Sequence, residues 1–213
     1  MQDSYYSRKE VSNSDLSALK NQLHPIDMPD PTQAYRFGNL IDAMITEQHR
    51  VNYFKRTCDD NVFSKEDFEI ALEMKKVFYA DETCKLISTG SDTQKVMSAV
   101  RTDFNYKGIN FSMPVRCKWD LWQPSWNWGG DIKSTTATTQ EQFEAAIRYF
   151  DYDRQRAWYM DIAKSNKDLL IGISKKNFKI FKVFIKRDDD LYNSGLQKYS
   201  YLAFMYKQLN QAA

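Results

Sequence analysis

The sequence predicts a mixed α/β domain of the α+β type, with a central mixed sheet flanked by helices. The first observation is the order of the expected elements: helices, three consecutive strands, a helical region, two further strands and a final helix. The second is composition, because 42% of the residues are hydrophobic and 15% are aromatic, as in a folded core. The third is that no internal repeat, low-complexity tract or linker divides the 213 residues. We therefore expect a single domain over 1–213.

The N-terminal part, residues 1–30, is polar and turn-rich, and we expect it to be an extension that carries one short helix. Ser14 is a suitable N-cap for that helix, which should end before Pro25. A second helix is expected to follow, with Asp30 as its N-cap. Pro31 would occupy its first position, where the missing N–H of proline costs nothing.

The third helix is expected to begin at a capping pair, Ser64 and Asp67, and to end near Tyr79. Several of its apolar residues fall on one stripe, which should face the core. The stripe residues are Phe68, Ala71, Leu72, Phe78 and Tyr79.

Five segments of strand-forming residues bounded by turn residues predict five strands in two groups. The first group is 94–104, 109–122 and 129–134, and the second is 169–174 and 178–185. A helical region over 138–166, with a break near Asp151, separates the two groups. A final helix is expected over 191–209.

Charge and cysteine content exclude some classes of protein. The net charge of +2 does not by itself identify a partner, since an acidic metal site can offset basic phosphate contacts. The three cysteines are scattered and form no CxxC pair, which argues against a disulfide framework or zinc ribbon and suits a reducing compartment. No apolar run approaches the roughly 18 residues of a membrane span, and no glycine-rich phosphate loop occurs. We expect a cytoplasmic protein that uses neither ATP nor a dinucleotide.

The residues that carry the clearest chemical pattern are Asp120, Asp131 and Lys133. On a strand, Asp131 and Lys133 share one face while Ile132 points into the core. Asp120 lies near the end of the preceding strand, which a short hairpin joins to the next. Two carboxylates and an ammonium are therefore expected to converge on one patch of the sheet.

Such a patch suits metal-dependent hydrolysis of phosphodiesters. The two aspartates supply hard oxygen ligands for Mg²⁺ or Mn²⁺. The bound ion lowers the pKa of a water that it holds and polarises the phosphoryl oxygen. Lys133 would orient that water or offset charge in the transition state. The alternative is a solvated surface ion pair between Asp131 and Lys133, worth less than about 1 kcal/mol.

The pattern Asp120…Asp131-Ile132-Lys133 resembles the D…(D/E)-x-K core of the PD-(D/E)XK nuclease superfamily. Gln155 and Tyr159, which share a helical face, match the Q-x-x-x-Y motif of its DNA-end-processing branches. Upstream, the S-x-S-x-L segment 12–16 and the segment 37–42, which opens with Phe-Gly, are most similar to the exonuclease VIII (RecE-type) branch of phages and prophages. The resemblance extends over about residues 10–205.

The resemblance implies a restriction-endonuclease-like core and a set of site residues. The implied catalytic residues are Asp120, Asp131, Lys133, Gln155 and Tyr159. The implied ligands of Mg²⁺ or Mn²⁺ are Asp42, Asp120, Asp131 and the main chain of Ile132. Two positions depart from the family pattern, since Asp42 stands where a histidine is usual and Gln94 where relatives often carry glutamate. An amide is a weaker ligand than a carboxylate, so Gln94 is not assigned to the metal.

The implied activity is that of a Mg²⁺-dependent deoxyribonuclease, most similar to exonucleases that act on double-stranded DNA ends in phage-type recombination. The resemblance also implies that the protein forms a homo-oligomer and has a single-strand annealing protein as a partner. Two alternatives remain open at this point. One is a structure-specific or restriction-type endonuclease, and the other is an inactive relative that only binds DNA.

Two further groups of residues bear on DNA binding. Arg148, Arg154 and Arg156 lie beside the Q-x-x-x-Y motif, and we expect them to meet phosphates near the metal. Four tryptophans crowd the hairpin between Asp120 and Asp131, where packing is a more common use than base stacking. They are Trp119, Trp122, Trp126 and Trp128.

Overall fold

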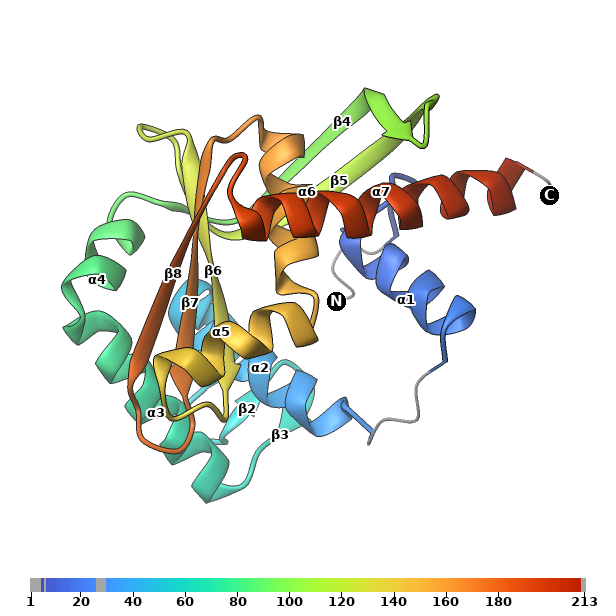
Figure 1. The fold of residues 1–213 in the computed structure, drawn as a ribbon. Helices are drawn as coiled ribbons and strands as arrows, with labels where there is room; N and C mark the ends of the chain where they lie inside the picture. The colour runs from blue at the N-terminus through green and yellow to red at the C-terminus, as the bar shows by residue number, and fades with distance from the viewer. Residues whose placement is uncertain (1–4, 6, 26–29, 212–213) are drawn as a thin grey trace.

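A five-stranded mixed sheet runs through the centre of the computed structural model, which describes residues 5, 7–25 and 30–211 (Figure 1). Its strands lie in the order in which they follow one another along the chain, and only β6 and β7 are parallel. They are β4 (Asp92–Tyr106), β5 (Ile109–Gln123), β6 (Trp128–Thr135), β7 (Lys167–Ser174) and β8 (Ile180–Lys186). The predicted α+β fold with a central mixed sheet is confirmed.

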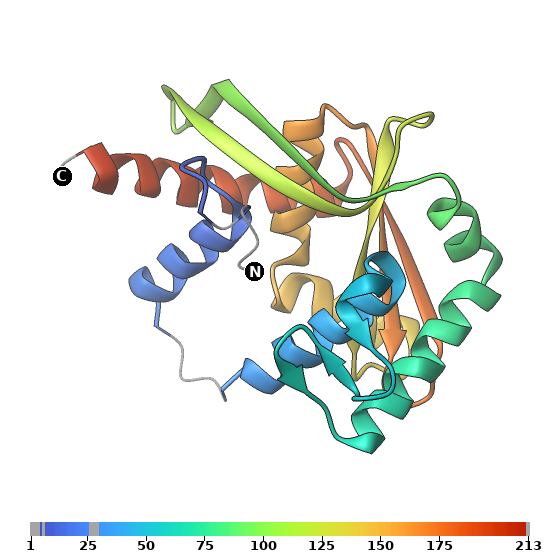
Figure 2. The ribbon, with the colours of Figure 1, turned by 180° about the vertical axis from the view of Figure 1, so that it is seen from behind.

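One face of the sheet is covered by three helices and a small sheet (Figures 1 and 2). The helices are α2 (Thr32–Thr46), α3 (Lys65–Ala80) and α4 (Glu82–Ser88), and a 3-10 turn spans Gln48–Arg50. The small sheet consists of β1 (Val51–Asn52), β2 (Thr57–Cys58) and β3 (Asn61–Val62). Gly38 of α2 lies against the end of β6, since a Cβ there would be 3.9 Å from Ser134 Oγ. This packing brings the next turn of α2, which carries Asp42, toward the centre of the sheet.

The opposite face packs against the remaining helices (Figure 1). They are α1 (Asn13–Leu23), α5 (Gln140–Tyr149), α6 (Tyr152–Ala163) and α7 (Asp190–Gln211). Helices α5 and α6 form the crossover that parallel strands β6 and β7 require. Ahead of α1, Val11 forms a parallel bridge with Val115 of β5, which ties the N-terminal segment to the sheet.

Strands β5 and β6 pair only at their shared turn and then separate. The last paired residues are Leu121 and Gly130. Gly129 is required there because a Cβ would lie 2.1 Å from the carbonyl oxygen of Leu121. Since the ladder ends at this point, Asp120 and Asp131 follow it on diverging strands, and side chains from other elements can enter between them.

The predicted elements are found within a few residues of their expected limits, with the helical break near Asp151 confirmed. Three details were wrong. Ser12 rather than Ser14 caps α1, because its capping box with Asp15 starts the helix two residues earlier. Helix α2 begins at Thr32, one residue later than expected. Leu72 and Tyr79 are exposed, since α3 turns only a narrow stripe toward the core.

Several features were not anticipated or lie beyond what the structure describes. Helix α4 and strands β1–β3 had no counterpart in the prediction, because segments this short carry too few residues for a periodic pattern. Part of the predicted extension, at 1–4, 6 and 26–29, lies outside the described residues. The helices formed by the described residues include none with the length and apolarity of a membrane span. All three cysteines are free and buried.

Candidate active site

Asp131 and Lys133 project from the same face of β6 into the space where β5 departs. Asp131 is buried, and the Nζ of Lys133 lies 2.5 Å from its Oδ2. Ile132 between them belongs to the hydrophobic core on the other face, as the alternation of a strand predicts. Lys133 is enclosed enough for burial to favour its neutral form, yet Asp131 and Asp120 together raise the pKa of its ammonium. The lysine is therefore a cation in this site.

Asp120 faces the same space from β5. Its Oδ2 accepts the backbone N–H of Ile132 at 2.8 Å, so β6 itself fixes the position of this carboxylate. Burial and the negative charges of Asp42 and Asp131 raise the pKa of Asp120 well above its ordinary value. The predicted convergence of Asp120, Asp131 and Lys133 is thus present in the fold.

Asp42 enters the site from α2 and is held by Gln94. The Nε2 of Gln94 donates to both carboxylate oxygens of Asp42, at 3.2 and 3.0 Å, and to Thr46 Oγ1 at 3.0 Å. Gln94 has a φ of 51° and is skipped in the ladder between Thr93 and Lys95, although the register is the same on either side. From this position its side chain reaches α2. Burial and the charge of Asp131 raise the pKa of Asp42 to about 6.

Beneath Asp131 lies a guanidinium that no part of the sequence pattern placed there. Arg156 of α6 is fully buried, and it donates from Nη1 to Asp131 Oδ1 at 2.7 Å and from Nε to Asp168 Oδ2 at 2.5 Å. It lies against two aromatic rings, with the guanidinium carbon 4.7 Å from the ring centre of Trp119 and 4.4 Å from that of Tyr159. This arrangement fixes one oxygen of Asp131 and leaves the other toward Lys133.

The expectation that three arginines meet phosphates was wrong for two of them. Arg156 is committed to Asp131 and Asp168, and Arg154 is buried against α1, where it donates to Asn13 and Ser17. Only Arg148 is exposed. This could not be predicted from the sequence, because the carboxylate and hydroxyl groups that stabilise a buried arginine lie on distant segments.

The two residues of the Q-x-x-x-Y motif have different surroundings. Tyr159 is buried, its ring packs edge-on against Trp119 at 5.6 Å, and burial raises the pKa of its hydroxyl well above the ordinary value. Gln155, one turn earlier on α6, is half-buried. Tyr159 therefore stabilises Arg156 by packing its ring against the guanidinium, while Gln155 lies nearer the surface. Trp119 and Trp122 are core residues, which agrees with packing as the more common use of tryptophan.

The comparisons with known proteins identify the family. The family model of the PDDEXK-like domain of unknown function (DUF3799) matches residues 4–212. The chain belongs to this family. The crystal structure of a protein from Eubacterium rectale, described as a candidate exonuclease, has a TM-score of 0.64 and 15% identity, covering 99% of this chain and 85% of that one. This likeness shows a shared fold.

The crystal structure of a phage-related exonuclease from Haemophilus somnus 129PT aligns less closely, with a TM-score of 0.43 and 13% identity over 94% of this chain and 84% of that one. No curated protein matches the chain. Membership of the PDDEXK-like family confirms the superfamily that the D…D-x-K pattern indicated.

The charge balance of this PDDEXK-like site suits a divalent cation. Four carboxylates influence one another across it, and among the described residues the cations paired with them are Lys133 and Arg156. The carboxylates are those of Asp42, Asp120, Asp131 and Asp168. When all are ionised, two negative charges are left over, and hard oxygen donors of this kind are the ligands that Mg²⁺ and Mn²⁺ prefer. The donor set therefore fits such an ion.

The present side-chain positions are not those of a coordinated ion. Within 5, 7–25 and 30–211, no three His, Cys, Asp or Glu side chains are already arranged to hold a metal. The carboxylate oxygens have other partners: Lys133 forms an ion pair with Asp131, and Gln94 and Thr46 donate to Asp42. Because a carboxylate offers several lone pairs, such partners can hold it in place while it binds a metal ion.

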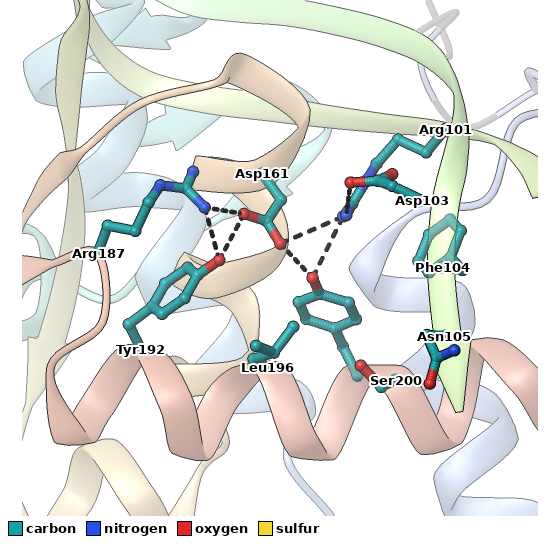
Figure 3. A pocket seen from close by; sticks show the side chains of 10 residues that line it. Arg101, Asp103, Phe104, Asn105, Asp161, Arg187, Tyr192, Leu196 and Ser200 are labelled. Atoms are coloured by element: carbon teal, nitrogen blue, oxygen red, sulfur yellow. Dashed lines mark hydrogen bonds and ion pairs between the residues drawn. The ribbon is translucent and has the colours of Figure 1, made fainter. Parts of the chain in front are cut away.

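A second group of polar residues in the PDDEXK-like domain surrounds a cavity of about 340 Å³ between β4 and α7 (Figure 3). Asp161 at its centre accepts from Arg101 at 3.3 Å, Arg187 at 2.8 Å and Tyr192 at 2.7 Å, and also from Tyr199. Burial raises the pKa of both tyrosines. Because these groups satisfy one another's hydrogen bonds, we interpret them as a structural network. None of the predicted site residues lines the cavity.

Proposed function

We propose that this PDDEXK-like protein is a metal-dependent deoxyribonuclease that hydrolyses DNA phosphodiester bonds with Mg²⁺ or Mn²⁺. The observation that carries the proposal is the meeting of Asp42, Asp120 and Asp131 with Lys133 at the point where β5 and β6 separate. These residues come from three elements, and their excess negative charge is costly in an enclosed site unless a cation balances it.

Each side chain has a role that its position supports. Asp120 and Asp131 are the principal ligands, with Asp42 as a third and the main chain of Ile132 nearby. A bound divalent ion would supply Lewis acidity and a water of lowered pKa. Lys133, once released from Asp131, holds a positive charge beside the attacked phosphate and can orient the water. Arg156 holds Asp131 from the side away from the substrate.

We further propose that the substrate is the end of double-stranded DNA and that the enzyme is an exonuclease of the type used in phage recombination. The name of the structural neighbour from Eubacterium rectale supports this direction, as does the similarity of the motif order to exonuclease VIII. A homo-oligomer that encloses the duplex and a single-strand annealing partner belong to the same proposal.

The decisive experiment follows degradation of linear duplex DNA labelled at its 5′ or 3′ ends, with Mg²⁺, Mn²⁺ or EDTA. Wild-type protein should release nucleotides only with a divalent ion. Asp120→Asn, Asp131→Asn and Lys133→Met should each lose at least about a hundredfold in rate, since each removes charge that acts on the transition state. Asp60→Asn is the matched control, because Asp60 is an exposed aspartate in the turn between β2 and β3.

The topology of the substrate separates the alternatives. An exonuclease leaves a covalently closed circle intact, whereas an endonuclease of the same superfamily cuts it. A wild-type protein that binds DNA, fails to bind Mn²⁺ and cuts neither substrate would be an inactive relative, and the proposal would be wrong.

A further inference from the structure

The corner between α5 and α6 presents three aromatic side chains in a connected row. Tyr149 and Phe150 are largely exposed, at 69% and 53% of their surface. Their ring centres are 4.8 Å apart with perpendicular planes, and Phe150 lies 5.7 Å from Tyr152 with the planes inclined by 30°. Exposed apolar rings that group in this way mark an interaction surface more often than isolated ones do.

This aromatic row, defined as Tyr149, Phe150 and Tyr152, leads directly to the candidate active site. The half-buried Tyr152 faces Lys133, whose Nζ lies 5.2 Å from the centre of the tyrosine ring. Tyr35 of α2, itself 69% exposed, is close enough to influence the pKa of Tyr152, which burial raises. Aromatic surface therefore continues from solvent to the proposed catalytic lysine.

The backbone of the corner is held in place by ion pairs. Asp151, between the two helices, has a φ of 56°, a left-handed conformation that few residues other than glycine adopt. Its carboxylate is 2.5 Å from Lys20 of α1 and 2.9 Å from Lys198 of α7, and Arg154 lies at 3.5 Å. Because these contacts join three helices, the row is preorganised, which lowers the cost of binding.

The charge around the row is suited to a polyanion. Lys20 and Lys198, whose side chains are 33% and 32% exposed, pair with Asp151 beside the row. Arg148 is exposed one residue before Tyr149, and Lys133 lies at the inner end of the row. A nucleic-acid strand has both features that this surface matches, flat bases for the rings and phosphates for the cations.

We infer that the aromatic row is a stacking platform for unpaired nucleotides of the DNA strand that enters the active site. The inference rests on the proposed function, and it adds that the enzyme prefers ends with single-stranded or frayed nucleotides over fully paired DNA. Stacking on aromatic side chains is tolerant of sequence, because every base has a π-face. The platform would position the strand so that its next phosphate lies beside Lys133.

The test measures binding in EDTA, where no cleavage occurs. The probe is duplex DNA with a short single-stranded end that contains 2-aminopurine, whose fluorescence falls when the base stacks. Tyr149→Ala and Phe150→Ala should weaken binding roughly fivefold to a hundredfold, the loss expected for one stack, and should restore the fluorescence. Phe150→Leu keeps an apolar side chain without the ring, and it should lose the quenching as well.

Two controls define the result. Phe54→Ala removes an aromatic side chain that is 94% exposed in the β1–β2 turn, and it should leave both signals unchanged. A duplex closed by hairpins at both ends has no free strand, and the variants should bind it as wild type does. Thermal melting shows that each variant is folded.

Three outcomes would overturn the platform: unchanged quenching in all three variants, equal weakening on the closed duplex, or a change in oligomeric state, which would make the row an interface with a second copy. The proposed nuclease activity fails separately. If wild type shows ring-dependent stacking and never cleaves DNA with Mg²⁺ or Mn²⁺, the platform stands without the enzyme.

Discussion

Replacing Arg156 by methionine should strongly destabilise the protein, because the change leaves two buried carboxylates without their shared cation. Asp131 and Asp168 are each no more than 1% exposed, and both are bonded to this guanidinium. Removing one member of a buried ion pair costs about 3–5 kcal/mol. In a domain of this size 1 kcal/mol corresponds to roughly 2–4 °C, so we expect Tm to fall by about 6–20 °C.

The loss should depend on pH. Burial raises the pKa of Asp168 to about 6, and Arg156 opposes that rise. Without Arg156 the pKa rises further, and a carboxyl with a raised folded-state pKa loses stability as pH increases through that value. The difference in Tm between Arg156→Met and wild type should therefore be larger at pH 8 than at pH 5.5, where Asp168 can take up a proton.

Thermal unfolding at the two pH values measures this directly. Arg148→Met makes the same substitution at an exposed arginine and should change Tm by no more than a degree or two, since surface changes are usually within about 0.5 kcal/mol. Arg156→Met with Asp168→Asn should be more stable than Arg156→Met alone, because one uncompensated charge is gone. A drop below about 2 °C at pH 8, or an equal drop at both pH values, would show that the guanidinium does not neutralise these carboxylates.

Three further predictions use the same kinds of measurement. Gly172→Ala should destabilise the protein by about 1–3 kcal/mol, because the new Cβ would lie 2.4 Å from the buried ring of Phe143; an unchanged Tm would mean that this ring can move. Gly38→Ala should instead stabilise α2 by about 0.5–1 kcal/mol, since nothing there is closer than 3.9 Å; a loss of Tm would contradict this. Gln94→Glu should lower Tm in EDTA, because a second carboxylate then faces Asp42. Adding Mn²⁺ should raise the Tm of this variant by more than it raises that of wild type. A rise no larger than that of wild type would place position 94 outside the metal site.

The secondary structure and one half of the candidate site could be predicted because their signals are local. Alternation along a strand places Asp131 and Lys133 on one face and Ile132 in the core, and a short hairpin brings Asp120 alongside. The helical break near Asp151 was likewise visible in the pattern. In each case neighbouring residues alone carry the information.

The other half of the site depends on contacts between distant segments. Gln94 and Asp42 are 52 residues apart, and their meeting depends on the left-handed backbone of Gln94 and on the packing of α2 against β6. No spacing in the sequence pointed to Thr46, Tyr152 or Asp168 as neighbours of the site.

By itself, the sequence indicated the superfamily, through the resemblance of its motifs, and the order of the five central strands and the longer helices. It also determined the D…D-x-K group, since short-range periodicity settles which face each side chain occupies. Only the tertiary structure decided that Arg156 is a buried support for Asp131 rather than a surface contact for phosphate. The physical reason is that an arginine can be buried only where carboxylates meet it, and its partners lie 12 and 25 residues away on two different strands.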